Sequence, residues 1–182
     1  MKKSVTTVVF PICALLLLAA CGEVADKKKA TAETVATPTV PAPATVAGVQ
    51  LKDDQLNALY QQYAQLTAAL VKGDAKEARF ASNAIEAGAR EMKSATQLGV
   101  SAAKITATAD LEAQRTAFAT LSNDLLALIK QSGLQTGQLY VDFCPMALND
   151  QGAVWISSDK TIQNPYFGEH MLTCGAVKET IQ

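Results

Sequence analysis

Residues 53–73, DDQLNALYQQYAQLTAALVKG, carry the strongest structural pattern in the chain. Its large apolar side chains recur at intervals of three and four residues, which places them on one face of an α-helix. They are Leu56, Leu59, Tyr60, Tyr63, Leu66, Leu70 and Val71. Asp53 or Asp54 can cap the first turn, and Gly73 ends the pattern. The sequence therefore predicts an amphipathic helix between these residues.

Further helices are predicted after this one. Asp74 is followed three residues later by Glu77, the spacing of a capping box, and begins a helix whose apolar face is mostly alanine. Asp110 can cap another helix, which ends before Gly133. Residues 99–108, between these two, are rich in small and β-branched residues and carry only a weak helical pattern. Short connections favour antiparallel neighbours, so we expect a mainly α fold, an up-and-down bundle of three or four helices.

The pattern changes after Gly137. Two short β-rich runs, residues 139–143 and 153–157, are separated by the turn-forming residues 149–152. We expect a small hairpin or two extended strips in a C-terminal extension of the bundle. Half of the chain's ten aromatic residues lie in this extension, together with two of its four cysteines. These aromatic residues are Tyr140, Phe143, Trp155, Tyr166 and Phe167.

The N-terminal residues have the pattern of an export signal. Lys2 and Lys3 precede an apolar run that ends in Leu-Ala-Ala-Cys, with Cys21 as its last residue. This pattern resembles a bacterial lipoprotein signal, which implies removal of residues 1–20, attachment of diacylglycerol to Cys21 and acylation of the new amino terminus. The run is shorter than the roughly 20 apolar residues of a membrane-spanning helix. We expect a cell-envelope protein that is lipid-anchored to a bacterial membrane and faces the periplasm or the exterior.

Residues 21–50 are predicted to tether this anchor to a folded domain at residues 51–182. The tether is rich in lysine, alanine, threonine, valine and proline, and it has no periodic apolar face. Its prolines favour extended polyproline II structure.

The charge balance excludes one class of partner. The chain of 182 residues has 16 basic and 17 acidic side chains, a net charge of -1 and a pI near 5.8. Binding of nucleic acid through bulk electrostatics requires a clustered basic surface, which the sequence does not indicate. We therefore do not expect nucleic acid as a partner.

Two motifs of the C-terminal extension contain soft metal ligands. They are CPMA at residues 144–147 and HMLTCG at residues 170–175. Thiolate and thioether sulfur suit Cu(I), and imidazole suits copper or zinc. Within each motif the ligands are two to four residues apart, which places them on one side of an extended strip or of a helical turn. The candidate ligands are Cys144, Met146, Met171 and Cys174, with His170 as an additional candidate.

A simpler interpretation of the cysteine pair stays open beside the metal site. Cys144 and Cys174 could form a structural disulfide, because the periplasm and the cell surface are oxidising. Such a bond would close a loop of about thirty residues and stabilise the fold by roughly 3 kcal/mol. Met146 and Met171 would then fill gaps around the aromatic side chains. The two interpretations are compatible, because a reversible disulfide could gate the thiolates.

The same motifs resemble the signature of the domain of unknown function 3347 family, over roughly residues 50–182. The similar segments are YVDFCPMA at 140–147, GAVWIS at 152–157, IQNPYFG at 162–168 and MLTCG at 171–175, with a helical leader pattern, QRxxFxxLS, at 114–122. Members occur as free exported proteins and fused to the periplasmic adaptor of Cus-like heavy-metal efflux pumps. The resemblance implies handling of copper or a related metal, with an efflux adaptor as candidate partner and the two cysteines and two methionines as ligands. Gln163, where arginine is expected, and His170, where a residue other than histidine is usual, depart from the pattern.

Enzymatic functions fit the sequence poorly. A cysteine hydrolase would pair Cys144 or Cys174 with His170, the only histidine, but no oxyanion motif accompanies them. A zinc enzyme would need more imidazole or carboxylate ligands. Residues 164–168 are expected to form a turn buried on the bundle and not a substrate loop.

We therefore expect a membrane-anchored lipoprotein, not an enzyme, that binds Cu(I) or a related soft ion and buffers it or delivers it to an efflux system. The alternative is an interaction lipoprotein without metal, in which the cysteine pair is a structural disulfide. Exposed aromatic side chains would favour a docking patch, whereas buried ones would favour a role in the core.

Overall fold

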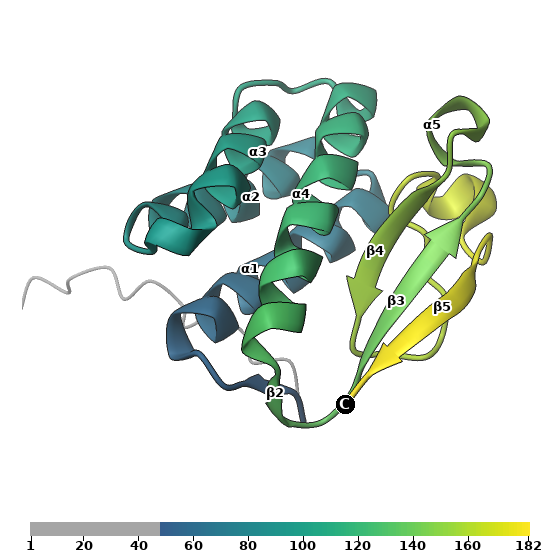
Figure 1. The fold of residues 1–182 in the computed structure, drawn as a ribbon. Helices are drawn as coiled ribbons and strands as arrows, with labels where there is room; N and C mark the ends of the chain where they lie inside the picture. Colours follow the sequence, from purple (N-terminus) through teal and green to yellow (C-terminus); the bar gives the residue numbers. More distant parts are fainter. Residues whose placement is uncertain (1–47) are drawn as a thin grey trace, which may run out of the picture. The chain divides into compact units, whose positions relative to one another are not determined.

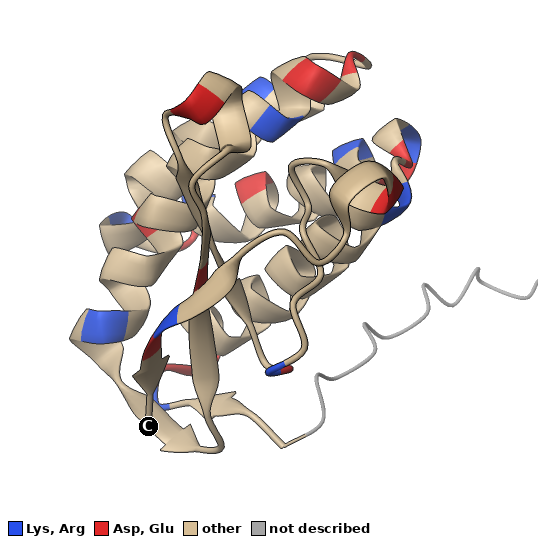
Figure 2. Cartoon of the chain, turned by 90° about the vertical axis from the view of Figure 1, so that its right-hand side faces the viewer, with Lys and Arg blue, Asp and Glu red and all other residues tan. Residues whose placement is uncertain are grey.

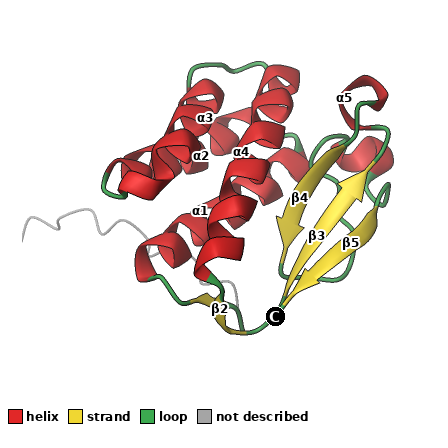
Figure 3. Ribbon diagram, viewed as in Figure 1, coloured by secondary structure: helices red, strands yellow, loops and turns green. Residues whose placement is uncertain are grey.

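The computed structural model describes residues 48–182, in which four long helices are followed by a small sheet (Figures 1 and 3). The helices are α1 (Asp54–Lys72), α2 (Ala75–Arg90), α3 (Thr96–Thr106) and α4 (Leu111–Ser132), with a 3-10 turn, η1 (Lys93–Ala95), before α3. The predicted signal at residues 1–20, the lipidation site Cys21 and most of the predicted tether lie outside the described residues.

The helices begin at the aspartates that the sequence indicated. The Asp53 carboxylate accepts a hydrogen bond from the backbone N–H of Leu56 at 2.8 Å and caps α1. Asp74 and Asp110 cap α2 and α4 in the same way. Gly73 ends α1 in the left-handed conformation, with φ at 71°. Each aspartate cap is worth about 1 kcal/mol, so the short connections of the bundle are set locally.

The helices form the predicted mainly α bundle. α2 packs between α1 and α3, and α3 packs on α4. The alanine-rich face of α2 is buried, and a Cβ atom at Gly88 would lie 2.9 Å from a methyl carbon of Leu59 in α1. Small residues thus let these two helices approach closely.

The weakly helical segment before α4 does form a helix, α3. Leu98, Ala102 and Ile105 are fully buried on it, and its Ala102 carbonyl accepts a hydrogen bond from the buried Ser82 hydroxyl at 2.9 Å. Burial of apolar area at the interface with α2 therefore outweighs the modest helix propensity of the segment.

The C-terminal extension is a three-stranded antiparallel sheet in the order β4-β3-β5. β3 (Leu139–Cys144) and β4 (Ala153–Ser157) form the predicted hairpin, around the short α5 (Ala147–Asp150). β5 (Ala176–Ile181) was not predicted and pairs with the other edge of β3. Most of its side chains are exposed, so it lacks the apolar alternation that reveals a half-buried strand. A 3-10 turn, η2 (Gly168–Met171), lies in the loop before β5.

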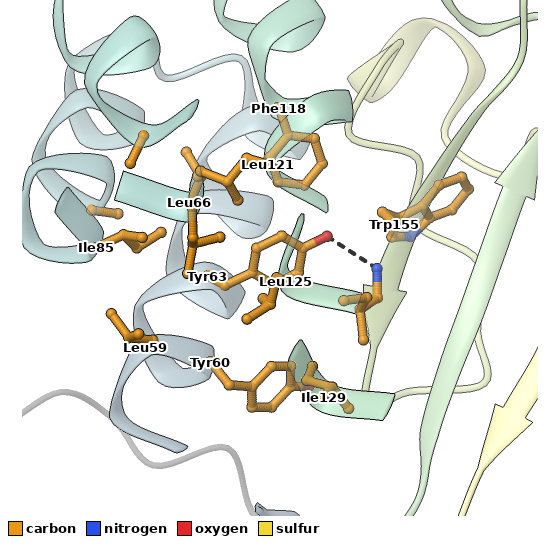
Figure 4. Close-up of a cluster of buried hydrophobic side chains, with 14 of the residues drawn as sticks. Leu59, Tyr60, Tyr63, Leu66, Ile85, Phe118, Leu121, Leu125, Ile129 and Trp155 are labelled. Carbon is orange, nitrogen blue, oxygen red and sulfur yellow. Dashed lines mark hydrogen bonds between the residues drawn. The ribbon is translucent and has the colours of Figure 1, made fainter. Parts of the chain in front are cut away.

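The sheet is attached to the bundle through β4. The Tyr63 hydroxyl of α1 accepts a hydrogen bond from the backbone N–H of Ile156 at 3.0 Å, as Figure 4 shows, and also bonds the Ser122 hydroxyl of α4 at 2.8 Å. A two-stranded ribbon of β1 (Gln50–Leu51) and β2 (Leu134–Thr136) joins the start of α1 to the end of α4.

The described surface carries charges of both signs. Figure 2 shows lysine and arginine residues spread over several elements and interspersed with aspartate and glutamate. Within residues 48–182, no helix combines the length and the apolar character needed to cross a membrane.

Candidate cysteine site

The fold brings Cys144 and Cys174 into contact. Cys144 is the last residue of β3 and is fully buried, whereas Cys174 lies two residues before β5 and is half-buried. Antiparallel pairing places the chain that enters β5 beside the chain that leaves β3. The two Sγ atoms are 2.8 Å apart, and both residues are free thiols in this structure.

A buried asparagine holds the loop that carries Cys174. The Asn164 side-chain amide donates a hydrogen bond to the Cys174 carbonyl at 2.7 Å. Its Oδ1 accepts hydrogen bonds from the backbone N–H groups of Tyr166, at 2.8 Å, and Phe167, at 3.3 Å. Asn164 is completely buried. One side chain therefore closes the turn and bonds to the backbone of Cys174.

Arg115 of α4 attaches the same loop to the helices. Its Nε donates to the Pro165 carbonyl at 3.0 Å, and its Nη2 donates to the Leu70 carbonyl of α1 at 3.3 Å. Gly168 allows the loop to approach α1, because a Cβ atom there would lie 2.7 Å from the Val71 carbonyl oxygen. The expectation that residues 164–168 form a turn buried on the bundle is confirmed.

Aromatic rings in edge-to-face and tilted contact connect the site to the bundle. Trp155 lies 6.0 Å from Tyr166 between ring centroids, and Tyr166 lies 5.7 Å from Phe118 of α4. Figure 4 shows Phe118 and Trp155 in the same buried cluster as Tyr63. Trp155 is only 1% exposed, and Tyr166 is also buried. Burial of these two rings favours a role in the core over a docking patch.

The Trp155 ring also adjoins the cysteine loop. A Cβ atom at Gly175, the residue after Cys174, would lie 2.9 Å from a carbon of that ring. The indole thus covers the backbone next to Cys174.

The other candidate ligands are arranged less closely. Met171 is half-buried at the end of η2, and its carbonyl accepts a hydrogen bond from the Cys174 N–H at 3.0 Å. Met146 is 48% exposed just after β3, and His170 is exposed on η2. Within residues 48–182, no three His, Cys, Asp or Glu side chains lie close enough to share a metal ion. The structure therefore brings together the two thiols and leaves Met146 and His170 at the surface.

The Cys174 thiol favours its protonated form. The hydrogen bond with Cys144, together with burial, raises the pKa of the Cys174 thiol above its ordinary value. Thiolate is the form that binds metals and attacks disulfides, so either reaction must first remove this proton.

Asp142, which is not among the predicted site residues, carries a buried carboxyl group two residues before Cys144. It lies opposite Trp155 of β4 and Val177 of β5 and is completely buried. Neither of its carboxyl oxygens has a hydrogen-bond partner among the described residues. Desolvation raises the pKa of this carboxyl to about 7. An aspartate inside a β-rich apolar run was the available signal, because aspartate is depleted in strands.

Comparison with known proteins identifies a family for the helical part of the chain. The model of the family described as protein of unknown function (DUF3347) matches residues 59–137, from within α1 to the residue after β2. The matched part contains the predicted leader pattern, and all five of its named residues are buried. They are Gln114, Arg115, Phe118, Leu121 and Ser122.

The four C-terminal segments that carried the resemblance lie beyond the matched residues. No curated protein and no solved structure matches the chain. Over residues 59–137 the chain is similar to the DUF3347 family of proteins of unknown function, and this match supports the resemblance that its motifs indicated.

Proposed function

We propose that this protein is a lipoprotein of the cell envelope that binds Cu(I) or a related soft metal ion and buffers it or delivers it to an efflux system. The observation that supports this proposal most strongly is the contact between Cys144 and Cys174. Their sulfurs are 2.8 Å apart, with Cys144 buried and Cys174 partly exposed. Two thiolates are a ligand set that suits Cu(I).

Metal binding would use the two cysteines unequally. Cys144 belongs to β3 and is buried, so its sulfur is the fixed ligand. Cys174 lies in the loop before β5 and is partly accessible, so its sulfur is the ligand that an incoming ion meets first. Binding would release the thiol protons and would move the two sulfurs apart to admit the ion.

Thioethers are the candidate additional ligands. Met171 is three residues before Cys174, and Met146 is two residues after Cys144. Neutral thioethers would complete the coordination of Cu(I) without adding charge, and an exposed Met146 would help to exchange the ion with a partner. The buried Trp155 beside Gly175 would keep water and oxidants from one side of the site.

A second candidate function is an interaction lipoprotein in which the cysteines form a structural disulfide. The same close approach of the two sulfurs favours it, because a bond between them requires little rearrangement. Burial of Trp155 and Tyr166 argues against an aromatic docking patch, so its partner surface would lie elsewhere.

Thiol counting followed by Cu(I) titration tests the proposal. In the mature lipoprotein, lipid would block Cys21, so that the reactive thiols are those of Cys144 and Cys174. We expect the reduced protein to compete with a chromogenic Cu(I) chelator for one ion per chain. Cys144→Ser and Cys174→Ser should each weaken that competition by at least about tenfold, because one thiolate cannot replace two.

Methionine variants refine the test. Met146→Leu and Met171→Leu should weaken Cu(I) binding less than the serine variants do, and Met92→Leu, outside the site, is the matched control. No competition by the reduced wild type would refute the metal function. Thiols that react only after reduction, with a large loss of stability once reduced, would favour the structural disulfide.

A further inference from the structure

We propose that Asn164 is a positioning residue that holds Cys174 against Cys144. The inference concerns the thiol pair itself and goes beyond the proposed metal function, since it applies whether the two sulfurs bind an ion or form a disulfide.

The two cysteines are held in different ways. Cys144 is fixed by the sheet, because it pairs with Ala153 of β4 at the end of the β3–β4 ladder. Cys174 belongs to no strand. Its N–H bonds only within its own turn, to the Met171 carbonyl, whereas its carbonyl accepts the 2.7 Å hydrogen bond from the Asn164 side chain. That bond ties Cys174 to a part of the loop ten residues away.

Asn164 is itself held firmly enough to serve as a support. Besides its side-chain bonds to the backbone of Tyr166 and Phe167, its backbone N–H donates to the Leu172 carbonyl at 2.8 Å. Arg115 anchors the next residue, Pro165, to α4. The helical bundle thereby determines, through one amide side chain, where Cys174 lies relative to β3.

This arrangement has a chemical consequence that can be measured without any metal. Oxidised glutathione reacts with the more accessible thiolate, that of Cys174, to give a mixed disulfide and one reduced glutathione. The Cys144 thiolate then attacks the Cys174 sulfur, which forms the Cys144–Cys174 disulfide and releases the second reduced glutathione. The rate of this closing step reports how well Cys174 is held near Cys144.

Two substitutions remove the bond to Cys174 and keep the turn. In Asn164→Ser the hydroxyl can still accept a hydrogen bond from the Tyr166 N–H, but it is too short to reach the Cys174 carbonyl. In Asn164→Asp the acceptor oxygen is kept and the amide donor is lost. The matched control is Ser82→Ala, which removes a buried donor to a backbone carbonyl, that of Ala102, far from the loop in sequence and between α2 and α3.

The experiment is performed on the reduced full-length mature protein, with glutathione disulfide as the probe, alkylation as the quench and mass spectrometry as the readout. We expect both Asn164 variants to close about five- to tenfold more slowly than the wild type, the effect of losing one hydrogen bond. Ser82→Ala should lower the melting temperature but close at the wild-type rate. Closing at the wild-type rate in both Asn164 variants would overturn the proposal, as would loss of the folded state in both, because the role of Asn164 would then be general stability.

The outcome is separable from that of the metal titration. Slow closing in the Asn164 variants with no Cu(I) binding by the wild type would support the positioning role and refute the metal function. Cu(I) binding by the wild type, with disulfide closing in the Asn164 variants at the wild-type rate, would support the metal function and refute the positioning role.

Discussion

The protonation state of Asp142 depends on the fold. Burial raises its pKa from 3.8 to about 7, and no described residue donates a hydrogen bond to its carboxyl oxygens. The folded protein therefore holds this proton more tightly than the unfolded chain does. The stabilising effect of the neutral carboxyl is complete below about pH 4, decreases as the pH rises toward 7 and is absent above that.

Asp142→Asn should remove this pH dependence. Relative to the wild type, the variant should gain free energy of unfolding between pH 4 and pH 7, reaching on the order of 3 to 4 kcal/mol at pH 8, apart from a constant offset for the new amide. Urea unfolding at several pH values measures it.

A matched control has the opposite sign. The pKa of the exposed Asp159 is lowered by hydrogen bonds from Thr161, so Asp159→Asn should lose stability at neutral pH and match the wild type in acid. A difference between Asp142→Asn and wild type that stays constant from pH 4 to pH 8 would contradict the account of Asp142.

The Tyr63 hydroxyl links three elements, and its removal should weaken the junction of sheet and bundle. Tyr63→Phe leaves the buried Ile156 N–H and the Ser122 hydroxyl without this partner, so we expect a loss of about 1 to 3 kcal/mol in the free energy of unfolding. Tyr140→Phe, which removes only a surface hydrogen bond to Gln138, is the control and should change stability little. Equal effects of the two substitutions in chemical denaturation would show that the junction does not depend on this hydroxyl.

At the scale of elements, the loop before β5 is a structural unit fastened to α1 and α4. Gly168 lies where the loop touches α1, with φ at 58° and no room for a Cβ atom beside the Val71 carbonyl. The loop thus depends on a glycine at its closest approach to the helix.

Gly168→Ala should therefore destabilise the protein by more than backbone strain alone. Gly48→Ala is the control, because Gly48 also has a positive φ, 88°, but has open space around its missing Cβ. We expect the Gly168 variant to have the clearly lower melting temperature and to expose Cys174 to faster alkylation. If the two variants have the same melting temperature, the close approach of loop and helix is not needed for stability.

The sequence predicted those elements whose signals are local. Aspartate caps, Gly73 and the apolar spacing of α1 and α4 act within a few residues, and the structure has each of them where expected. α3 and β5 were harder to predict from the sequence. α3 depends on burial against α2, and β5 is an exposed edge strand defined by pairing with β3.

The site was predictable in part for the same reason. The ligand chemistry of a cysteine or a methionine follows from its residue type, so the thiol pair could be predicted from the motifs. The residues that hold this pair in place, Asn164 and Arg115, could not be predicted in the same way. They act through hydrogen bonds to the backbone of residues that only the fold brings near. Asn164 lies in a predicted turn and Arg115 lies in the leader pattern. Neither pattern indicates that Arg115 holds the loop that contains Asn164.

At the scale of the whole molecule, the helical part matched by the family model carries a sheet and loop that hold the cysteines. Residues 59–137 supply the buried Arg115, Phe118 and Ser122, and each of these contacts the C-terminal layer directly or through Tyr63. The helical bundle therefore supports the C-terminal sheet and loop, and this C-terminal part carries the thiols of Cys144 and Cys174.

The proposed anchor gives the molecule its location, and it is testable by mass. Expression of the full chain in a bacterium with lipoprotein processing should yield a membrane-bound protein that lacks residues 1–20 and carries lipid on Cys21. Cys21→Ser should abolish the lipid mass and release the protein from the membrane fraction. Cys13→Ser, within the predicted signal, is the control and should leave both unchanged. Retention of residues 1–20 in the wild type would contradict the lipoprotein proposal.

Cys144 and Cys174 are proposed to bind one soft metal ion together. X-ray absorption at the copper edge of the reduced mature protein, loaded with one equivalent of Cu(I) and desalted, tests it most directly. We expect retained Cu(I) with a coordination shell of sulfur that contains at least two scatterers and is lost in Cys144→Ser. Copper removed by desalting, or a shell of nitrogen and oxygen that is the same in wild type and variant, would contradict it.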